Sequence, residues 1–462
     1  ATRQVTSADS ILIPAAEVAQ CGADPATRAI VDKAEADSKE AGKRVVATGY
    51  TQPFRRGVFT TPAGATEPGS NRGIESSLGD LVADSLREMI LTPDGKSVDI
   101  GMINAGDLRA DLVPNEDGTI TYAQTYEVEP FSNQLGYVTL KGSDLKDALE
   151  QQWKTDLNSQ NSRPMLKLSL SSNVRYTYDP ARPYGERITS VTINGEPLKA
   201  DGTYTVGSVN FLLDGGDSFE ALTRGGAAIL NGNLDRDSIN AYLARHSGVA
   251  DRAAGAAGGL TPREAKSSIG LTLPTEAVAD GSTVTIPLRG LSFSEGPSIT
   301  TKVRVSAGGP EAVADVDNSL VDAHASDAAA VITTDGAGQA SVDVTVVGAC
   351  EGKAAGEVVN VALTVATDFA TVVEATDGLT IPVTCAGTEV PVPAPSPSAN
   401  ADQGAAPGAG APAPTKKPNA GAPRGAIART GADSRGLPVA FLLAVVGVAA
   451  LWLRRSQIVT SR

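Results

Sequence analysis

The sequence predicts an α+β domain, then an all-β, immunoglobulin-like sandwich, a disordered linker and one C-terminal transmembrane helix. Three observations lead to this fold class. Over residues 49–250, apolar runs of strand length alternate with segments of helical period. Over 262–390, short stretches alternate apolar residues with Thr, Ser or charge, without a helix between them. Beyond residue 390, a Pro- and Ala-rich stretch leads into an apolar run.

Composition limits the classes of function. The 462-residue chain has a net charge of −14, which argues against a nucleic-acid polymer as partner, because phosphates need positive charge opposite them. Aromatic residues make up 4% of the chain, so a Phe in a polar loop is informative. The chain begins with Ala and opens with no apolar signal segment. This favours a mature or truncated product whose precursor carried a signal peptide.

The N-terminal segment, 1–48, is expected to contain one helix and one strand. Asp24 offers an N-cap, Pro25 suits the first helical position, and Gly42 can end the helix. Val45–Ala47 follows as a strand. A solvated surface helix explains the composition of this segment.

The α+β domain, 49–250, is predicted from its alternating periods. A helix over 75–89 has one apolar face, and a buried strand over 98–103 delivers Asn104 at its C-terminal end. Asn194-Gly195 is typical of a two-residue hairpin turn. The other predicted strands and helices are 135–140, 144–153, 174–178, 188–193, 204–208 and 237–244.

The sandwich, 262–390, follows an Ala/Gly hinge at 250–259. Cys350 and Cys385 lie in its β-patterned part and could pair, which suits an extracellular setting and leaves Cys21 over. No residues there are arranged for chemistry, so we expect a spacer. Its predicted strands are 282–288, 301–305, 340–347, 358–366 and 379–384.

The C-terminal region is predicted to leave the folded part and reach a membrane. Residues 391–435 have the composition of a solvated linker. Residues 437–453 are seventeen in number and carry no charge, which is just enough to span a bilayer. The basic tail, 454–462, is expected in the cytoplasm, which places the bulk of the protein outside the cell.

Five polar segments lie at the edges of apolar runs in the α+β domain, where binding loops occur. They are residues 71–80, 103–109, 129–133, 175–179 and 210–219. In order and spacing, these segments resemble the C-terminal, substrate-binding domain of the 5′-nucleotidase family. The resemblance covers about residues 50–250, roughly two fifths of the chain. In this family, a long helix like the one expected at 24–43 joins two domains, so the resemblance implies an interdomain helix in the segment 1–48.

The resemblance implies that Phe131 and Phe211 enclose the base of a nucleotide substrate. A flat base favours aromatic faces, and stacking contributes roughly 1–3 kcal/mol per base. A single Phe after Pro is more often a lid over the core. Two Phe residues in matching segments favour stacking instead.

The resemblance also assigns the polar side chains. Arg72 and Arg109 match arginines that contact the ribose and phosphate side of the substrate, for which a planar guanidinium is suited. Asn104 and Asn133 match residues near the base edge. Asp217 matches a carboxylate that accepts hydrogen bonds from the ribose hydroxyls. Gly106, Gly215 and Gly216 would let backbone approach the ligand.

Two positions depart from the family pattern. Asp107 stands where the family commonly has Gly, so it either pairs with Arg109 and weakens phosphate binding or faces away. Asp80 stands where the family usually has Asn, and we expect a structural effect there. These departures put substrate affinity in doubt and leave the fold prediction intact.

Catalysis in the family uses two divalent metal ions, held by a separate N-terminal metallophosphatase domain. Such a site needs several His and carboxylate side chains, whereas this chain has two His, His246 and His324. Asp322-Ala323-His324 imitates a family motif by chance. We therefore predict no catalytic residue, no metal site and no cofactor in this chain.

The segment 427–431, Ile-Ala-Arg-Thr-Gly, precedes the apolar run and the basic tail. This arrangement resembles a sortase cell-wall sorting signal, with Ile427 in place of the usual Leu. The resemblance implies that a sortase cleaves between Thr430 and Gly431 and joins Thr430 to cell-wall peptidoglycan. A plain single-pass anchor is the alternative.

The favoured interpretation is the substrate-binding portion of a secreted, cell-surface 5′-nucleotidase-like phosphoesterase that hydrolyses extracellular nucleotides to nucleoside and phosphate. Its metallophosphatase domain would be a missing or separately encoded partner. The alternative is a non-catalytic surface module for nucleotide binding or adhesion, and the sequence upstream of Ala1 would discriminate the two. A UDP-sugar or cyclic nucleotide also remains open as substrate, because an aromatic sandwich accepts any base.

Overall fold

The computed structural model describes residues 10–58, 60–61, 64–65, 68–154, 165–248, 259–296, 299–318 and 337–387. It divides the chain into one unit of Ala1–Ser38 with Glu389–Arg462 and a second of Lys39–Thr388. The predicted linker, membrane span, basic tail and sorting residues Thr430 and Gly431 lie outside the described residues, as does His324. Across the described ranges, no helix has both the length and the apolar character that crossing a membrane requires.

The described residues of the first unit are helical. The short α1 (Ala15–Val18) and η1 (Ala19–Cys21) precede α2 (Pro25–Gly42), whose last residues belong to the second unit. The amide of Thr27 donates to Asp24 Oδ1 at 2.8 Å, so Asp24 caps the helix. The predicted bounds of this helix are therefore confirmed. Cys21 is a free, exposed thiol.

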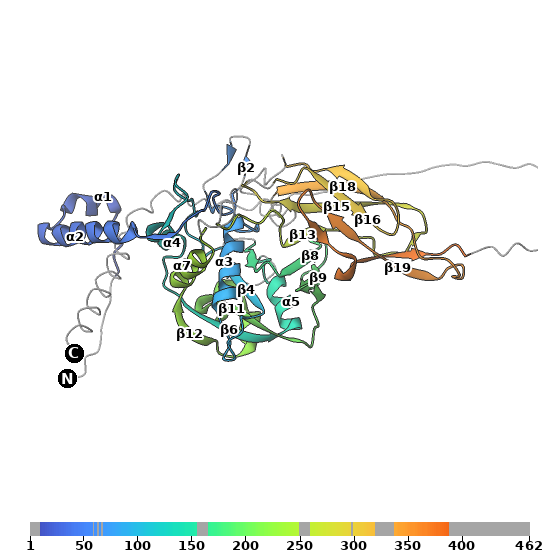
Figure 1. Cartoon of the computed structure of the whole chain (residues 1–462), viewed down its shortest axis with the longest axis horizontal. Helices are drawn as coiled ribbons and strands as arrows, with labels where there is room; N and C mark the ends of the chain where they lie inside the picture. The colour runs from blue at the N-terminus through green and yellow to red at the C-terminus, as the bar shows by residue number, and fades with distance from the viewer. Residues whose placement is uncertain are drawn as a thin grey trace, which may run out of the picture. The chain divides into compact units, whose positions relative to one another are not determined.

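A five-stranded sheet forms the centre of the α+β part (Figure 1). The central strand, β11, runs antiparallel to β6 and parallel to β4. The sheet order is β12 (Ile229–Leu234), β6 (Gln134–Lys141), β11 (Thr203–Val209), β4 (Ile100–Asn104) and β7 (Leu168–Leu170).

Helix α3 (Ser77–Met89) packs closely along β4 (Figure 1). A Cβ at Gly101 would lie 1.9 Å from the carbonyl oxygen of Ala83, so this contact requires glycine. The helix begins two residues later than predicted, because the Ser76 side chain accepts from the amide of Gly79 and caps it. Its predicted apolar face is buried, as expected.

The remaining elements complete this part. The sequence did not predict α4 (Tyr122–Val128), although Gln124 Oε1 accepts from the Thr121 amide at its start, as in a capping box. The other helices are α5 (Gly142–Glu150), α6 (Asn210–Leu213), η2 (Gly216–Ser218), η3 (Glu220–Gly225) and α7 (Asp235–Arg245). The small strands are β1 (Val45–Ala47), β2 (Thr60–Thr61), β3 (Gly64–Ala65) and β5 (Ile120–Thr121).

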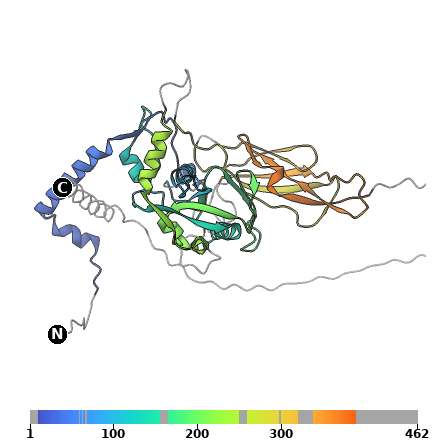
Figure 2. The same ribbon diagram turned by 60° about the horizontal axis from the view of Figure 1, so that its bottom comes forward.

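The all-β part has a second hydrophobic core, and its strands are coloured yellow to orange in Figure 2. The predicted strand over 358–366 is two strands, β19 and β20. Cys350 and Cys385 form a disulfide, the pairing that the sequence allowed. An immunoglobulin-like topology stays a prediction. The strands are β14 (Val278–Ala279), β15 (Thr283–Ser292), β16 (Lys302–Ser306), β17 (Ala312–Asp315), β18 (Ala337–Thr345), β19 (Val358–Ala362), β20 (Thr364–Ala366), β21 (Thr371–Val373) and β22 (Thr380–Thr384).

One sheet runs from the α+β part into the all-β part, in the order β10-β9-β8-β13-β15-β18. Strand β13 pairs in parallel with β8 and antiparallel with β15. The predicted regions 49–250 and 262–390 therefore share a sheet. Its first four strands are β10 (Glu196–Pro197), β9 (Ile188–Ile193), β8 (Val174–Tyr178) and β13 (Ser268–Leu271).

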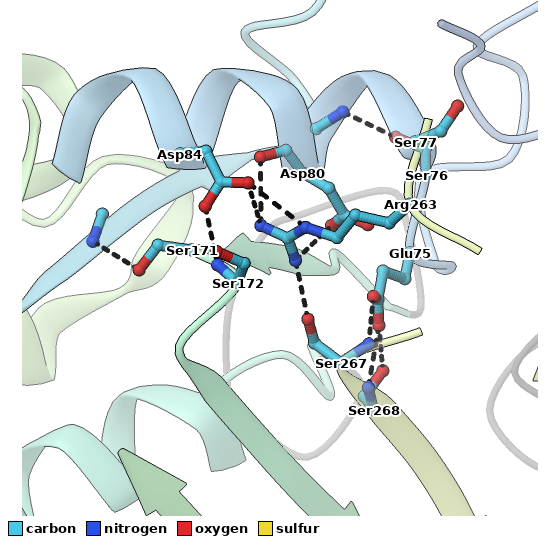
Figure 3. Close-up of polar contacts among 12 residues, drawn as sticks. Glu75, Ser76, Ser77, Asp80, Asp84, Ser171, Ser172, Arg263, Ser267 and Ser268 are labelled. Carbon is cyan, nitrogen blue, oxygen red and sulfur yellow. Dashed lines mark hydrogen bonds and ion pairs between the residues drawn. The ribbon is translucent and has the colours of Figure 1, made fainter. Parts of the chain in front are cut away.

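A buried polar network reinforces this connection at the start of α3 (Figure 3). The Glu75 carboxylate accepts from the amides of Ser267 and Ser268 at 2.6 and 3.0 Å. The Arg263 guanidinium lies 2.8 Å from Asp84 Oδ2 and donates to the carbonyl oxygen of Asp80 at 3.3 Å. Helix α3 is thus tied to the segment that enters β13.

Candidate functional site

Three strands of the central sheet end or begin at one edge. Leu135 at the start of β6 pairs with Val209 at the end of β11, and β4 runs parallel to β11. The segments after β4, after β11 and before β6 therefore meet, at the kind of edge where ligands of open α/β sheets bind. The Asn210 side chain accepts from the Gln134 amide at 3.0 Å and holds two of these segments together.

Both predicted stacking residues present exposed rings at this edge. Phe131 is 49% exposed and Phe211 is 44% exposed, and in the described part of the chain neither ring packs on another aromatic ring. Phe211 lies on the single-turn helix α6 rather than in the predicted loop. A Cβ at Gly216 would lie 2.6 Å from the Phe211 ring, so glycine lets the ring rest against the following turn.

A polar cluster forms between the segments that follow β4 and β11. Asn104 Nδ2 donates to Asp217 Oδ2 at 2.7 Å. A Cβ at Gly106 would lie 3.0 Å from that same oxygen and 3.4 Å from Arg72 Nη1. The structure thus brings together four residues that the sequence singled out: Arg72, Asn104, Gly106 and Asp217. The buried Oδ1 of Asn104 accepts no hydrogen bond within the described residues.

Arg109 joins this cluster to Phe131. Its Nη1 donates to the carbonyl oxygen of Gly106 at 3.2 Å, and its guanidinium carbon lies 5.6 Å from the centre of the Phe131 ring. This geometry allows a cation–π contact. Arg109 has no carboxylate partner within ion-pair distance among the described residues, so it keeps donors for an anion.

Asp107 lies in a buried acidic cluster and forms no ion pair with Arg109 among the described residues. Its Oδ1 accepts from Asn133 Nδ2 at 3.2 Å. Asp235 Oδ2 accepts from the Asn133 amide at 2.8 Å. Glu129 is buried close by, and its Oε1 has no hydrogen-bond partner in the described chain. The backbone amide of Asn133 therefore donates to Asp235, and its side-chain amide donates to Asp107.

Burial raises the pKa of Asp107 to about 7. The charges of Asp235 and Asp217 add to this rise, whereas the Arg109 guanidinium opposes it. Burial also raises the pKa of Glu129 well above its usual range and raises that of Asp235. Because closely placed carboxylates cannot all ionise in a buried site, this cluster holds protons near neutral pH.

Asp107→Asn should therefore stabilise the protein above pH 7. A carboxyl whose pKa is raised in the folded state favours folding at low pH and loses that contribution as pH rises toward 7. The variant lacks this loss, so its unfolding free energy should exceed that of the wild type by up to about 4 kcal/mol at pH 8 and by little at pH 4. Urea unfolding at both pH values measures the difference.

The exposed Asp201 offers a matched control, because Asp201→Asn changes the same charge outside the cluster. An Asp107→Asn variant whose stability relative to wild type does not change with pH would contradict the buried-proton interpretation.

One predicted segment serves the core instead of the site. Tyr176 and Tyr178 of β8 are buried, and the Tyr176 hydroxyl donates to Gln152 Oε1 at 3.2 Å. Sequence reasoning did not single out Glu129 and Asp235, or Lys154, which lies behind Asp217. The sequence around Lys154 and Asp235 gives no local signal for either residue.

In the described ranges, no group of three or more His, Cys, Asp or Glu side chains is arranged to hold a metal ion. The described residues therefore do not fit a two-metal site, which the family resemblance places in a separate N-terminal domain.

Comparisons with known proteins find similarity over part of this chain. Residues 57–224 match the family model of the 5′-nucleotidase C-terminal domain. A cell wall protein of Listeria monocytogenes is 34% identical over 156 residues, which are 32% of this chain and 19% of that protein. The human 5′-nucleotidase is 26% identical over 183 residues, 37% of this chain and 31% of the enzyme.

A similar solved structure is the 5′-nucleotidase precursor of Thermus thermophilus, with 28% identity and a TM-score of 0.37. The match covers 48% of this chain and 40% of that one. The chain thus spans from about a fifth to two fifths of these proteins. Over residues 57–224, it is similar to the C-terminal domain family of the 5′-nucleotidases.

Proposed function

We propose that this chain is the substrate-binding portion of a secreted, cell-surface 5′-nucleotidase-like phosphoesterase, which hydrolyses extracellular nucleotides to nucleoside and phosphate. One observation carries the proposal. Two half-exposed Phe rings flank a cluster of Arg, Asn and Asp side chains at the edge where β4, β6 and β11 meet. The family match over 57–224 covers this edge.

Each group of the site suits one part of a mononucleotide. Phe131 and Phe211 offer apolar faces to the base. Asp217 offers acceptor oxygens to the ribose hydroxyls, although one of them already accepts from Asn104. Arg72 and Arg109 offer donors to the phosphate side.

Hydrolysis would need a further part of the enzyme. We assign the two divalent metal ions to an N-terminal metallophosphatase domain, which would act with this chain as a partner. In such an enzyme, the residues described here would bind and orient the nucleotide. We derive no chemical step from them.

The location we propose is the cell wall. The name of the Listeria relative supports this, as does the arrangement of Thr430 and Gly431 before an apolar run. A sortase would join Thr430 to peptidoglycan after a transient membrane stage. The disulfide between Cys350 and Cys385 suits an oxidising exterior.

Calorimetry with the full chain tests the binding function. AMP should bind one to one, and ribose 5-phosphate should bind at least about tenfold more weakly, because it lacks the stacking base. The same chain with Mg²⁺, Mn²⁺ or Zn²⁺ should release no phosphate from AMP. Failure of AMP to bind would overturn the proposal, and phosphate release above background would show that the chain contains its own metal site.

The alternative is a surface module that binds nucleotides or adheres without catalysis. The name of the Listeria relative, a cell wall protein, favours it. A mixture of this chain with its upstream or separately encoded metallophosphatase domain separates the two functions. Phosphate release by the mixture would support the enzyme, and binding without release would support the module.

A further inference from the structure

The turn that carries Asp217 has a strained backbone. Gly215, Asp217 and Ser218 have φ angles of 87°, 54° and 60°. The left-handed region disfavours residues with a Cβ, and two such residues in succession persist only when their surroundings hold them. Because Asp217 is the proposed ribose ligand, whatever holds this turn also sets the position of the carboxylate.

Lys154 contacts this turn from the interior. Its Nζ donates to the carbonyl oxygen of Ser218 at 3.3 Å and lies 3.3 Å from the centre of the buried Phe219 ring. The residue is 1% exposed. Three positions earlier, Gln151 Oε1 accepts from the Ala221 amide at 3.0 Å. The residues that follow α5 thus form hydrogen bonds with the turn at Ser218 and with the chain after it at Ala221.

The charge of Lys154 acts on the same turn. Burial lowers the pKa of Lys154 to about 7, and the Asp217 carboxylate opposes this shift. The Asp217 carboxylate is thus a charged group whose field acts on this amine. Lys154 is therefore charged below neutral pH and loses its proton above it.

We propose that Lys154 is a positioning residue of the ligand site. Its ammonium group fixes the turn from Gly215 to Phe219 so that the Asp217 carboxylate faces the ribose of a bound nucleotide. This inference rests on the proposed function, because it assigns a role within the same binding site. Lys154 makes no contact with the ligand in this scheme.

The test is calorimetry of the full chain with adenosine between pH 6 and pH 9. Adenosine lacks the phosphate, so the ligand itself does not titrate in this range. Wild-type affinity should fall about tenfold as Lys154 loses its proton, which is the size expected for a hydrogen bond to a charged donor. Lys154→Met should bind about tenfold more weakly at pH 6, with little further change up to pH 9.

Two variants separate the charge from the fold. Lys154→Arg stays charged throughout, so it should bind more tightly than Lys154→Met at pH 9. Lys154→Met should unfold at an equal or higher temperature than the wild type at pH 6, because a buried charge is costly. Lys167→Met is the matched control: Lys167 is equally buried, lies over the rings of Tyr176 and Tyr178, and should leave adenosine affinity unchanged.

Asp107 also titrates near pH 7, but it is present in every variant. The pH dependence that Lys154→Met removes therefore belongs to Lys154. Equal affinities and pH profiles for wild type and Lys154→Met would overturn this inference. So would a Lys154→Arg variant that binds adenosine no better than Lys154→Met at pH 9. Either result would leave the proposed function standing. If the wild type binds neither adenosine nor AMP, the proposed function itself fails.

Discussion

Replacing Phe131 and Phe211 together by Ala should abolish measurable nucleotide binding while the protein remains folded. Each stacking face contributes roughly 1–3 kcal/mol, so losing both should weaken AMP binding by about 10²-fold or more. The two rings are about half exposed, and burying them is therefore a minor part of the folding free energy. Calorimetry with AMP and thermal unfolding of the same samples measure both effects.

The single variants and one distant aromatic residue make this result specific. Phe131→Ala and Phe211→Ala should each weaken binding about tenfold, and the Tyr replacements should bind nearly as well as the wild type. Tyr184, an exposed ring outside the site, provides the control, and Tyr184→Ala should bind AMP normally. Unchanged affinity in the double variant, with the fold intact, would remove the stacking hypothesis.

Several strands and one hairpin turn near the site could be predicted from the sequence. The strand ending at Asn104 was evident as a buried apolar run, and the strands at Val174–Tyr178 and Ile188–Ile193 have their predicted bounds. Asn194 and Gly195 have the positive φ angles that their hairpin requires. These features depend on residues close in sequence, which is why local patterns reveal them.

Contacts between segments that are distant in sequence could not be predicted from local patterns. Whether Asp107 pairs with Arg109 or faces inward depends on Asn133 and Asp235, which arrive on other elements. Lys154 follows a predicted helix like any exposed lysine, and burial against Phe219 gives it a different character. Strand β7 has three residues, too few for a period to show. The stacking role of Phe131 and Phe211 stays a prediction, and it came from a resemblance that supplied long-range information.

The second large effect concerns the polar network at the start of α3 (Figure 3). Arg263→Ala should destabilise the protein by about 3–5 kcal/mol, because it leaves buried carboxylates without their cation. The Arg263 side chain is 17% exposed and that of Asp80 is 0% exposed, so water cannot replace the lost charge. Urea unfolding at pH 7 measures the loss.

An exposed ion pair supplies the comparison. Lys353 lies 2.7 Å from Glu357 with both side chains 41% exposed, so Lys353→Ala should cost less than about 1 kcal/mol. Asp80→Asn combined with Arg263→Met should recover part of the stability, because Asp80 then carries no charge, whereas Asp84, 2.8 Å from Arg263 in the wild type, keeps its own. An Arg263→Ala variant no less stable than Lys353→Ala would contradict the assignment of this network as a structural clamp.

The pH dependence of Arg263→Ala distinguishes lost charge from lost packing. Burial raises the pKa of Asp80 well above its usual range, and Arg263 opposes that rise in the wild type. Without Arg263 the pKa should rise further, so the folded variant holds a proton that the unfolded chain releases as pH increases. Its stability deficit should therefore grow from pH 4 toward pH 8, whereas a deficit due to lost packing would be the same at both.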